Sequence, residues 1–178
     1  MTVNEAYRIH AEQAIAVANL LKVPADEILM YAFSVQKIEN RSYNPNAKNK
    51  NSTARGMMQM LEGTQKEVET KFLKLPYSPD KIYDPSYAVF LGQYELVRQY
   101  KRYGKNWRKA VHAYNQGSYQ ESKSNTKIFK NGELYANRVL NELNSTDFAA
   151  LNQTTGVSVV AANTTGNSST QSLSQEWT

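Results

Sequence analysis

Residues 83–104, YDPSYAVFLGQYELVRQYKRYG, contain the clearest helix signal in the chain. Asp84 is typical of a helix N-cap and Pro85 of the first helical turn, whereas Gly104 is typical of a helix end. No segment of the chain shows the sustained alternation of apolar and polar residues that a half-buried strand requires. The chain is therefore predicted to be mainly α-helical, with few or no strands.

Polar loops, the longest of them RSYNPNAKNKNST at residues 41–53, separate further predicted helices. Asn4 and Asn106 are candidate N-caps, and Pro24 is suited to a first turn. The sequence predicts helices over about residues 4–22, 24–40, 63–75, 84–103, 106–115 and 132–144.

The composition changes after residue 144. Residues 1–144 contain all 21 Lys and Arg residues, whereas residues 145–178 are rich in Ser, Thr, Asn and Gln and carry only two acids. The apolar island VSVVAA at 157–162 is too small to form a core by itself. We predict a folded body over 1–144 and a low-complexity tail over 145–178. The tail is either disordered or an assembly arm anchored by this island and Trp177.

Several classes of protein are excluded or disfavoured by composition. The absence of Cys rules out disulfides and Cys-based catalytic or metal sites. Glu5, Arg8 and Glu12 interrupt the segment where a signal peptide needs an apolar core, and no window is long and apolar enough to span a membrane. The basic residues are scattered and match no nucleic-acid-reading module, so nucleic acid is not an expected partner.

Glu39 lies at an unusual position for a carboxylate. On a helical wheel it continues the apolar stripe of Ile28, Ala32 and Val35, at the negative end of the predicted helix. Partial burial and the helix dipole would both raise its pKa, as a general acid requires. The alternative is an ordinary solvated Glu in the last turn of a helix.

Three segments occur in a fixed order around this acid: ENRSYNPNAKNKNSTARGMMQM (39–60), AYNQG (113–117) and ELYANRV (133–139). Together they resemble the catalytic domain of the soluble-lytic-transglycosylase family, which belongs to the lysozyme-like superfamily. The similarity covers about residues 24–144. It implies a lysozyme-like α-helical domain that acts on peptidoglycan glycan strands.

The resemblance implies one catalytic residue, Glu39, and no cofactor or metal. Gln59, Tyr114 and Asn115 would bind the sugar, and Tyr135 would lie close to Glu39. Gln59 can donate and accept hydrogen bonds, and Gly56 would allow a close backbone approach. Met58 is a candidate wall of the cleft, although residues such as Met57 and Met58 are more often core than ligand contacts. Tyr114 also suits a packed core position.

The reaction that the family implies is cleavage of the β-1,4 bond between N-acetylmuramic acid (MurNAc) and N-acetylglucosamine (GlcNAc), which leaves a 1,6-anhydromuramoyl end. Two alternatives remain open: a muramidase that hydrolyses the same bond, and a catalytically silent structural protein on the same fold. Four residues depart from the usual pattern, namely Asn40, Thr53, Glu62 and Gln116. Glu62 matters most, because a second carboxylate in the cleft would favour hydrolysis.

Three features of the sequence indicate where the protein acts: a wall-cutting domain, no recognisable signal peptide, and a polar tail without Lys or Arg. We expect a component of a bacteriophage particle or similar injection machine, with residues 145–178 contacting other virion proteins. The nearest alternative is a cytoplasmic endolysin that a holin releases.

Overall fold

The computed structural model describes residues 1–159 and contains seven α-helices over this range, with two isolated β-bridges in place of strands. The predicted mainly α-helical class is confirmed. The helices are α1 (Val3–Leu21), α2 (Ala25–Glu39), α3 (Glu62–Glu67), α4 (Pro85–Arg102), α5 (Trp107–Gln116), α6 (Lys127–Ser145) and α7 (Phe148–Thr155).

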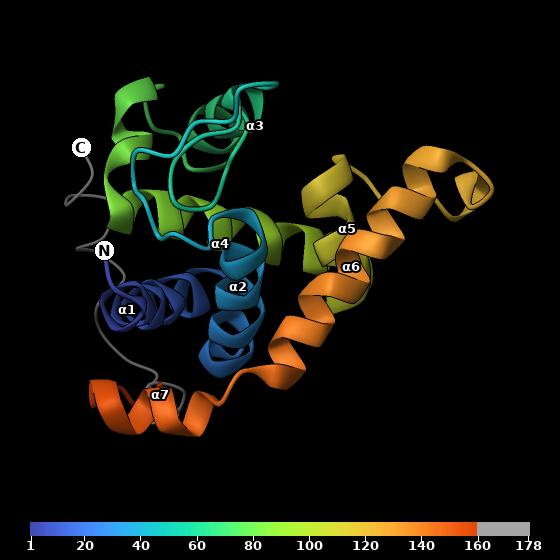
Figure 1. The fold of residues 1–178 in the computed structure, drawn as a ribbon. Coiled ribbons are helices and arrows are strands. Elements are labelled where there is room, and N and C mark those ends of the chain that lie inside the picture. The colour runs from blue at the N-terminus through green and yellow to red at the C-terminus, as the bar shows by residue number, and fades with distance from the viewer. Residues whose placement is uncertain (160–178) are drawn as a thin grey trace.

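Helix α4 is the centre of the fold. All its residues from Tyr87 to Val97 are buried, and it packs against α1, α2 and α5. Asp84 caps it, accepting a hydrogen bond from the backbone N–H of Tyr87, and Pro85 occupies the first turn as expected. A helix that is buried on every side must be covered by several other elements, which accounts for the arrangement around it (Figure 1).

The structure corrects two predicted helix starts. The first helix is capped by Thr2, not Asn4, because Thr2 and Glu5 form a capping box in which each side chain accepts the other's backbone N–H. The last helix of the body begins at Lys127, not near 132, with Thr126 as its cap. The short helix capped by Asn106 is found where predicted.

The third predicted helix consists of two parts. Helix α3 continues into a π-helical segment, Val68–Phe72, which ends before Pro76 as expected. A short 3-10 helix, Pro79–Tyr83, leads from there into α4.

The loop between α2 and α3 is held on the body at two glycines. Gly56 has a φ of 78°, and a Cβ there would lie 2.5 Å from the carbonyl oxygen of Ile82. At Gly92 of α4 a Cβ would lie 2.5 Å from Cγ of Met58. Both positions need glycine, because backbone or side chain from the partner segment occupies the space of a side chain.

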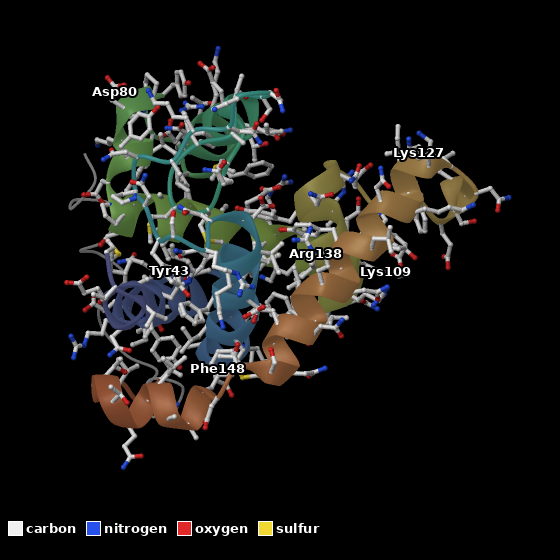
Figure 2. All side chains as sticks on the ribbon, viewed as in Figure 1. Tyr43, Asp80, Lys109, Lys127, Arg138 and Phe148 are labelled. Atoms are coloured by element: carbon white, nitrogen blue, oxygen red, sulfur yellow. The ribbon has the colours of Figure 1, made fainter. Side chains whose placement is uncertain are left out.

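Part of the predicted tail belongs to the folded body. Asp147 caps α7, and Tyr7 of α1 donates a hydrogen bond of 2.7 Å to Asn152 of α7. Phe148 packs beside the rings of Tyr7 and Phe33 where α7 meets the body (Figure 2). Residues 148–155, expected as part of a tail that is either disordered or an assembly arm, form a helix that packs on α1.

The apolar island at 157–162 is only partly described. Val157 packs against the core and Val159 is 3% exposed. Residues 160–162 and Trp177, the proposed anchor of an assembly arm, lie outside the described residues.

A buried polar network joins three helices of the core. His10 of α1 is hydrogen-bonded through Nε2 to Gln36 of α2, and Gln93 of α4 donates to its Nδ1 at 3.2 Å. Complete burial lowers the pKa of His10 to about 4, because the charged imidazolium would be desolvated. The ring is therefore neutral at pH 7, and each nitrogen has a partner.

This burial predicts acid sensitivity. The unfolded chain binds a proton at His10 near the ordinary pKa of about 6.5, whereas the folded protein does so only near 4, so lowering the pH through this window favours unfolding. The free energy of unfolding should fall by up to about 3 kcal/mol from this group. Urea unfolding between pH 7 and pH 4 measures the loss. In His10→Gln the same curve should be flatter, and equal slopes in both proteins would contradict the assignment.

Candidate active site

Glu39 is the last residue of α2, and its position follows from the apolar face of that helix. Ile28, Ala32 and Val35 on the same stripe are all 0% exposed, and the Glu39 side chain is partly buried beyond them. Tyr135 of α6 donates a hydrogen bond of 2.7 Å from its hydroxyl to Oε1 of Glu39. The expected proximity of Tyr135 and Glu39 is confirmed.

The protonation of Glu39 is determined by opposing effects. Burial raises the pKa of the carboxyl group, while the hydrogen bond from Tyr135 and the positive charge of Arg138 lower it. Burial is the largest of these, so the net pKa lies above its usual value. The acid is thereby biased toward the protonated form, the form that can donate a proton.

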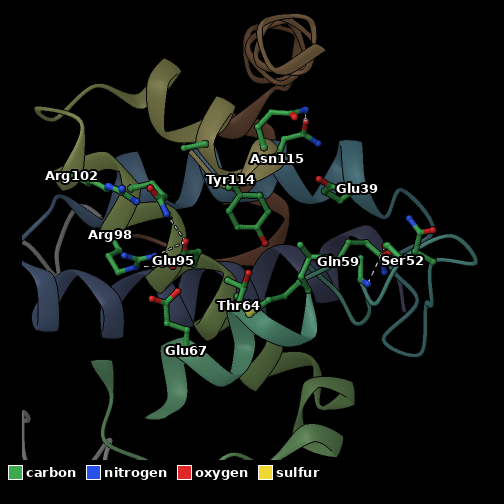
Figure 3. Close-up of a pocket in the computed structure, with 18 of the residues that line it drawn as sticks. Glu39, Ser52, Gln59, Thr64, Glu67, Glu95, Arg98, Arg102, Tyr114 and Asn115 are labelled. Atoms are coloured by element: carbon green, nitrogen blue, oxygen red, sulfur yellow. Dashed lines mark hydrogen bonds and ion pairs between the residues drawn. The ribbon is translucent and has the colours of Figure 1, made fainter. Parts of the chain in front are cut away.

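Glu39 opens into a cavity of about 710 Å³ between the 40–61 loop, α3, α4 and α5 (Figure 3). Gln59, Tyr114 and Asn115 also line it, as predicted, whereas Tyr135 supports Glu39 through its hydroxyl. The other lining residues are Asn49, Ser52, Ala54, Met60, Leu61, Thr64, Glu67, Lys71, Glu95, Arg98, Gln99, Arg102, Ala113, Gln116 and Gly117.

Gln59 is fixed by the backbone of its own loop. The backbone of Gln59 has a φ of 50°. The side-chain NH₂ group of Gln59 donates to the carbonyl oxygens of Gly56 at 3.0 Å and Ala47 at 3.3 Å. Both amide hydrogens are thus used within the protein. Toward a ligand, Gln59 offers its carbonyl oxygen, which makes it an acceptor rather than the donor and acceptor expected from its residue type.

Met58 does not line the cavity. Its side chain is 1% exposed and lies against Gly92, so the expectation that it forms a cleft wall is wrong. Its backbone carbonyl has a different role, because the Tyr114 hydroxyl donates a hydrogen bond of 2.9 Å to it. The backbone carbonyl of Met58 therefore fixes the position of the Tyr114 side chain.

Asn115 and Gln116 form the rim at the end of α5. Asn115 is exposed, and the amide of Gln116 donates to its Oδ1 at 2.5 Å. Gln116, one of the four departures from the family pattern, therefore contributes to the cavity rim and orients its neighbour.

Asn40 and Thr53, two further departures, organise the loop. The Asn40 side chain is buried, donates to the carbonyl of Asn44 at 2.8 Å and accepts from the Ser42 hydroxyl at 2.9 Å. The Thr53 hydroxyl accepts the backbone N–H of Glu62 at the start of α3, at 3.1 Å. These bonds hold the loop that carries Gln59.

Glu62 points away from the cavity that contains Glu39. Its Oε1 accepts a hydrogen bond of 2.9 Å from the Tyr77 hydroxyl, and it lines a separate cavity with Lys48 and Tyr83. Glu62 is therefore not a second carboxylate beside the candidate acid.

Sequence reasoning missed a charged stripe on α4 that lines the cavity. Glu95, Arg98, Gln99 and Arg102 lie at helical offsets of three, four and seven, which place them on one face. The signal was present as a polar stripe in an otherwise apolar helix. An ordinary solvated face has the same pattern, so only the packing of α4 distinguishes the two.

A family model for the transglycosylase SLT domain matches residues 31–135, which are more than half of the chain. The chain belongs to this family. The matched segment runs from α2 to Tyr135, so it contains Glu39 and every predicted sugar-binding residue. The family is that of lytic transglycosylases, enzymes that cleave peptidoglycan. A search of curated proteins found no match to the chain.

Two further properties of the SLT domain concern cofactors and membranes. Among residues 1–159, no group of three or more His, Asp or Glu side chains lies close enough to hold a metal ion. Over the same range, no helix is both long and apolar enough to cross a lipid bilayer.

The Tyr135–Glu39 hydrogen bond gives a prediction about acidity. Replacing Tyr135 with Phe removes a donor that favours the ionised carboxylate, so the pKa of Glu39 should rise further above that of the wild type. A ¹³C NMR titration of the Glu39 carboxyl carbon measures this directly. Tyr119→Phe is the control, because it removes the hydroxyl group of a tyrosine that lies away from Glu39. A Glu39 pKa that stays constant or falls in Tyr135→Phe would contradict the role assigned to this bond.

Proposed function

We propose that this SLT domain cleaves the MurNAc–GlcNAc β-1,4 bond of peptidoglycan with Glu39 as its single acid and base, and releases 1,6-anhydromuramoyl ends. The observation that supports this most strongly is the state of Glu39: partly buried, raised in pKa, held by Tyr135 and opening into a large polar cavity. A carboxyl group in this condition is suited to donate a proton near neutral pH.

The reaction needs two proton transfers at one carboxyl group. Glu39 first donates its proton to the glycosidic oxygen, and the bond from C1 of MurNAc to that oxygen breaks. The N-acetyl group of the substrate or the oxocarbenium-like cation carries the developing positive charge. The Glu39 carboxylate then accepts the proton of the MurNAc 6-hydroxyl while O6 bonds to C1. No water is consumed, and Glu39 returns to its protonated state.

The environment of the other acids favours this outcome over hydrolysis. Glu95 lies in the cavity but accepts two hydrogen bonds from Arg98, and Glu67 is 3.4 Å from Lys71. Glu62 lies outside it. Each carboxylate other than Glu39 is thus engaged by a cation or placed elsewhere, so none is poised to activate a water as the second carboxylate of an inverting glycosidase does.

Substitution of Glu39 tests the catalytic role. Glu39→Gln keeps the shape and removes the transferable proton, so release of soluble fragments from purified peptidoglycan should fall by about 10³-fold. The thermal midpoint should stay equal or rise, because a partly buried acid is replaced by a neutral group. Glu62→Gln is the matched control and should retain wild-type activity. Equal lysis by wild type and Glu39→Gln would exclude this mechanism and leave a structural role for the fold.

The chemical ends of the products separate the two enzymatic possibilities. Mass spectrometry of the fragments released by the wild type should find anhydromuramoyl ends, which are lighter than reducing ends by one water. Reducing ends throughout would identify a muramidase and overturn the lyase assignment while keeping Glu39 as the acid.

We also propose that the protein reaches the wall as part of a bacteriophage particle or another injection apparatus. The support is the composition of residues 160–178, which contain no Lys or Arg and are rich in Ser, Thr, Asn and Gln. Such a segment is suited to ordering on a partner protein. Purified particles should then contain the chain, and a chain lacking residues 160–178 should keep its activity on isolated peptidoglycan but fail to be incorporated. Particles devoid of the wild-type protein would refute this location.

A further inference from the structure

The end of the cavity opposite Glu39 contains an arginine held rigidly in place. Arg98 donates from Nε to Oε2 of Glu95 at 2.8 Å and from Nη2 to Oε1 at 3.0 Å. Its guanidinium group also lies 4.4 Å from the centre of the Phe72 ring. The Nη1 group takes no part in the bidentate pair, and 21% of the side chain is exposed. The protein therefore presents a guanidinium edge whose orientation is set in advance.

The surroundings of Arg98 complete a polar site. Arg102 and Lys71 line the same cavity, and its acidic lining residues besides Glu39 are Glu67 and Glu95. Gln99, 1% exposed, donates to Glu95 at 2.6 Å, and its Oε1 is buried without a hydrogen-bond partner within residues 1–159. The bond from Gln99 is a further hydrogen bond that fixes the Glu95 carboxylate, the partner of Arg98.

Tyr114 connects this end to the candidate acid. Its ring lies between Glu39 and Glu95 in the cavity (Figure 3), and the charges of both carboxylates, after burial, contribute to raising its pKa. A strand that placed its scissile bond at Glu39 would therefore extend over Tyr114 toward Arg98.

We propose that the Arg98 end of the cavity is a carboxylate-binding subsite that recognises the peptide stem of the wall strand. This inference rests on the proposed function. The sugar rings of a wall strand are uncharged, and its carboxylates are those of the stem peptides or, where a stem is missing, of the exposed lactyl group. Arg98 would bind the carboxylate with its Nη1 edge, and Arg102 and Lys71 would add attraction.

The choice of the stem over the lactyl group follows from how the groups are placed. The lactyl carboxylate is joined to the sugar ring through only one ether oxygen and one carbon, whereas the carboxylates of the stem peptide lie further from the ring. Arg98 and Arg102 belong to α4, and Glu39 lies on the other side of Tyr114. A group that extends away from the ring is better suited to the far end of the cavity than a group attached to it.

A comparison of two substrates tests the subsite. The kcat/KM is measured on strands that carry stems and on strands from which an amidase has removed the stems. The ratio of the first value to the second is compared among the wild type and two double variants. In Glu95→Gln/Arg98→Gln the ratio should fall about tenfold relative to the wild type, the effect of losing a hydrogen bond to a charged group. The double change leaves no unpaired buried charge. Arg41→Gln/Glu142→Gln removes another Arg–Glu pair, 2.8 Å apart and outside the cavity, and should leave the ratio unchanged.

Two results would overturn the proposal. The first is an unchanged ratio in the Glu95/Arg98 variant, and an equal loss of kcat/KM on both substrates, the sign of general damage to the cavity, gives this result. The second is a wild type that prefers stripped strands and loses that preference in the variant, which would identify the lactyl carboxylate as the ligand.

A binding measurement separates this proposal from the catalytic one. The Glu39→Gln protein is titrated with a free stem peptide that has no sugar, and backbone NMR shifts are followed at residues 95–102. Shift changes that disappear when the peptide carboxylates are amidated support the subsite even if the wall is not cleaved. If the wild type releases anhydro ends but the titrated Glu39→Gln protein shows no shift change at residues 95–102, the subsite is overturned and the catalytic proposal stands.

Discussion

The burial of α4 from Tyr87 to Val97 is the constraint on which the rest of the structure depends. A stretch of helix covered on all sides needs several partners, and two of them, α2 and α5, supply Glu39 and Tyr114 to the cavity. Gly92 lets Met58 lie directly against the helix, which positions the loop before α3. The Met58 carbonyl in turn holds the Tyr114 hydroxyl. One packing contact on α4 therefore aligns two walls of the site.

The fold places the Glu39 carboxyl group where its charged form is destabilised by burial. An acid that extends an apolar stripe loses hydration, and burial raises its pKa. The Tyr135 hydroxyl compensates in part and fixes the direction of the carboxyl group from a helix almost a hundred residues away in sequence. The result is a carboxyl group with a raised pKa and a defined orientation, which a solvated Glu at a helix end would not have.

The departures from the family pattern mostly serve the loop rather than the reaction. Asn40 and Thr53 form hydrogen bonds that shape residues 40–62, and Glu62 faces a different cavity. Three charged groups of the cavity, Glu95, Arg98 and Arg102, come instead from α4, where Glu95 and Arg98 form an ion pair of 2.8 Å. In the functions proposed above, chemistry and recognition are divided between two ends of one cavity, with Tyr114 between them.

The sequence by itself determined the helical class, most helix positions and the main candidate residues, because caps, periodicity and ordered motifs are local properties of the chain. It also determined that Glu39 continues an apolar face. Tertiary structure decided the rest. It decided that Met58 is core, that the Gln59 amide is committed to its own loop, and that the 95–102 stripe faces a cavity instead of solvent. It also decided that residues 148–155 dock on α1. Each of these depends on which surfaces meet, and a helical pattern does not specify its own partner.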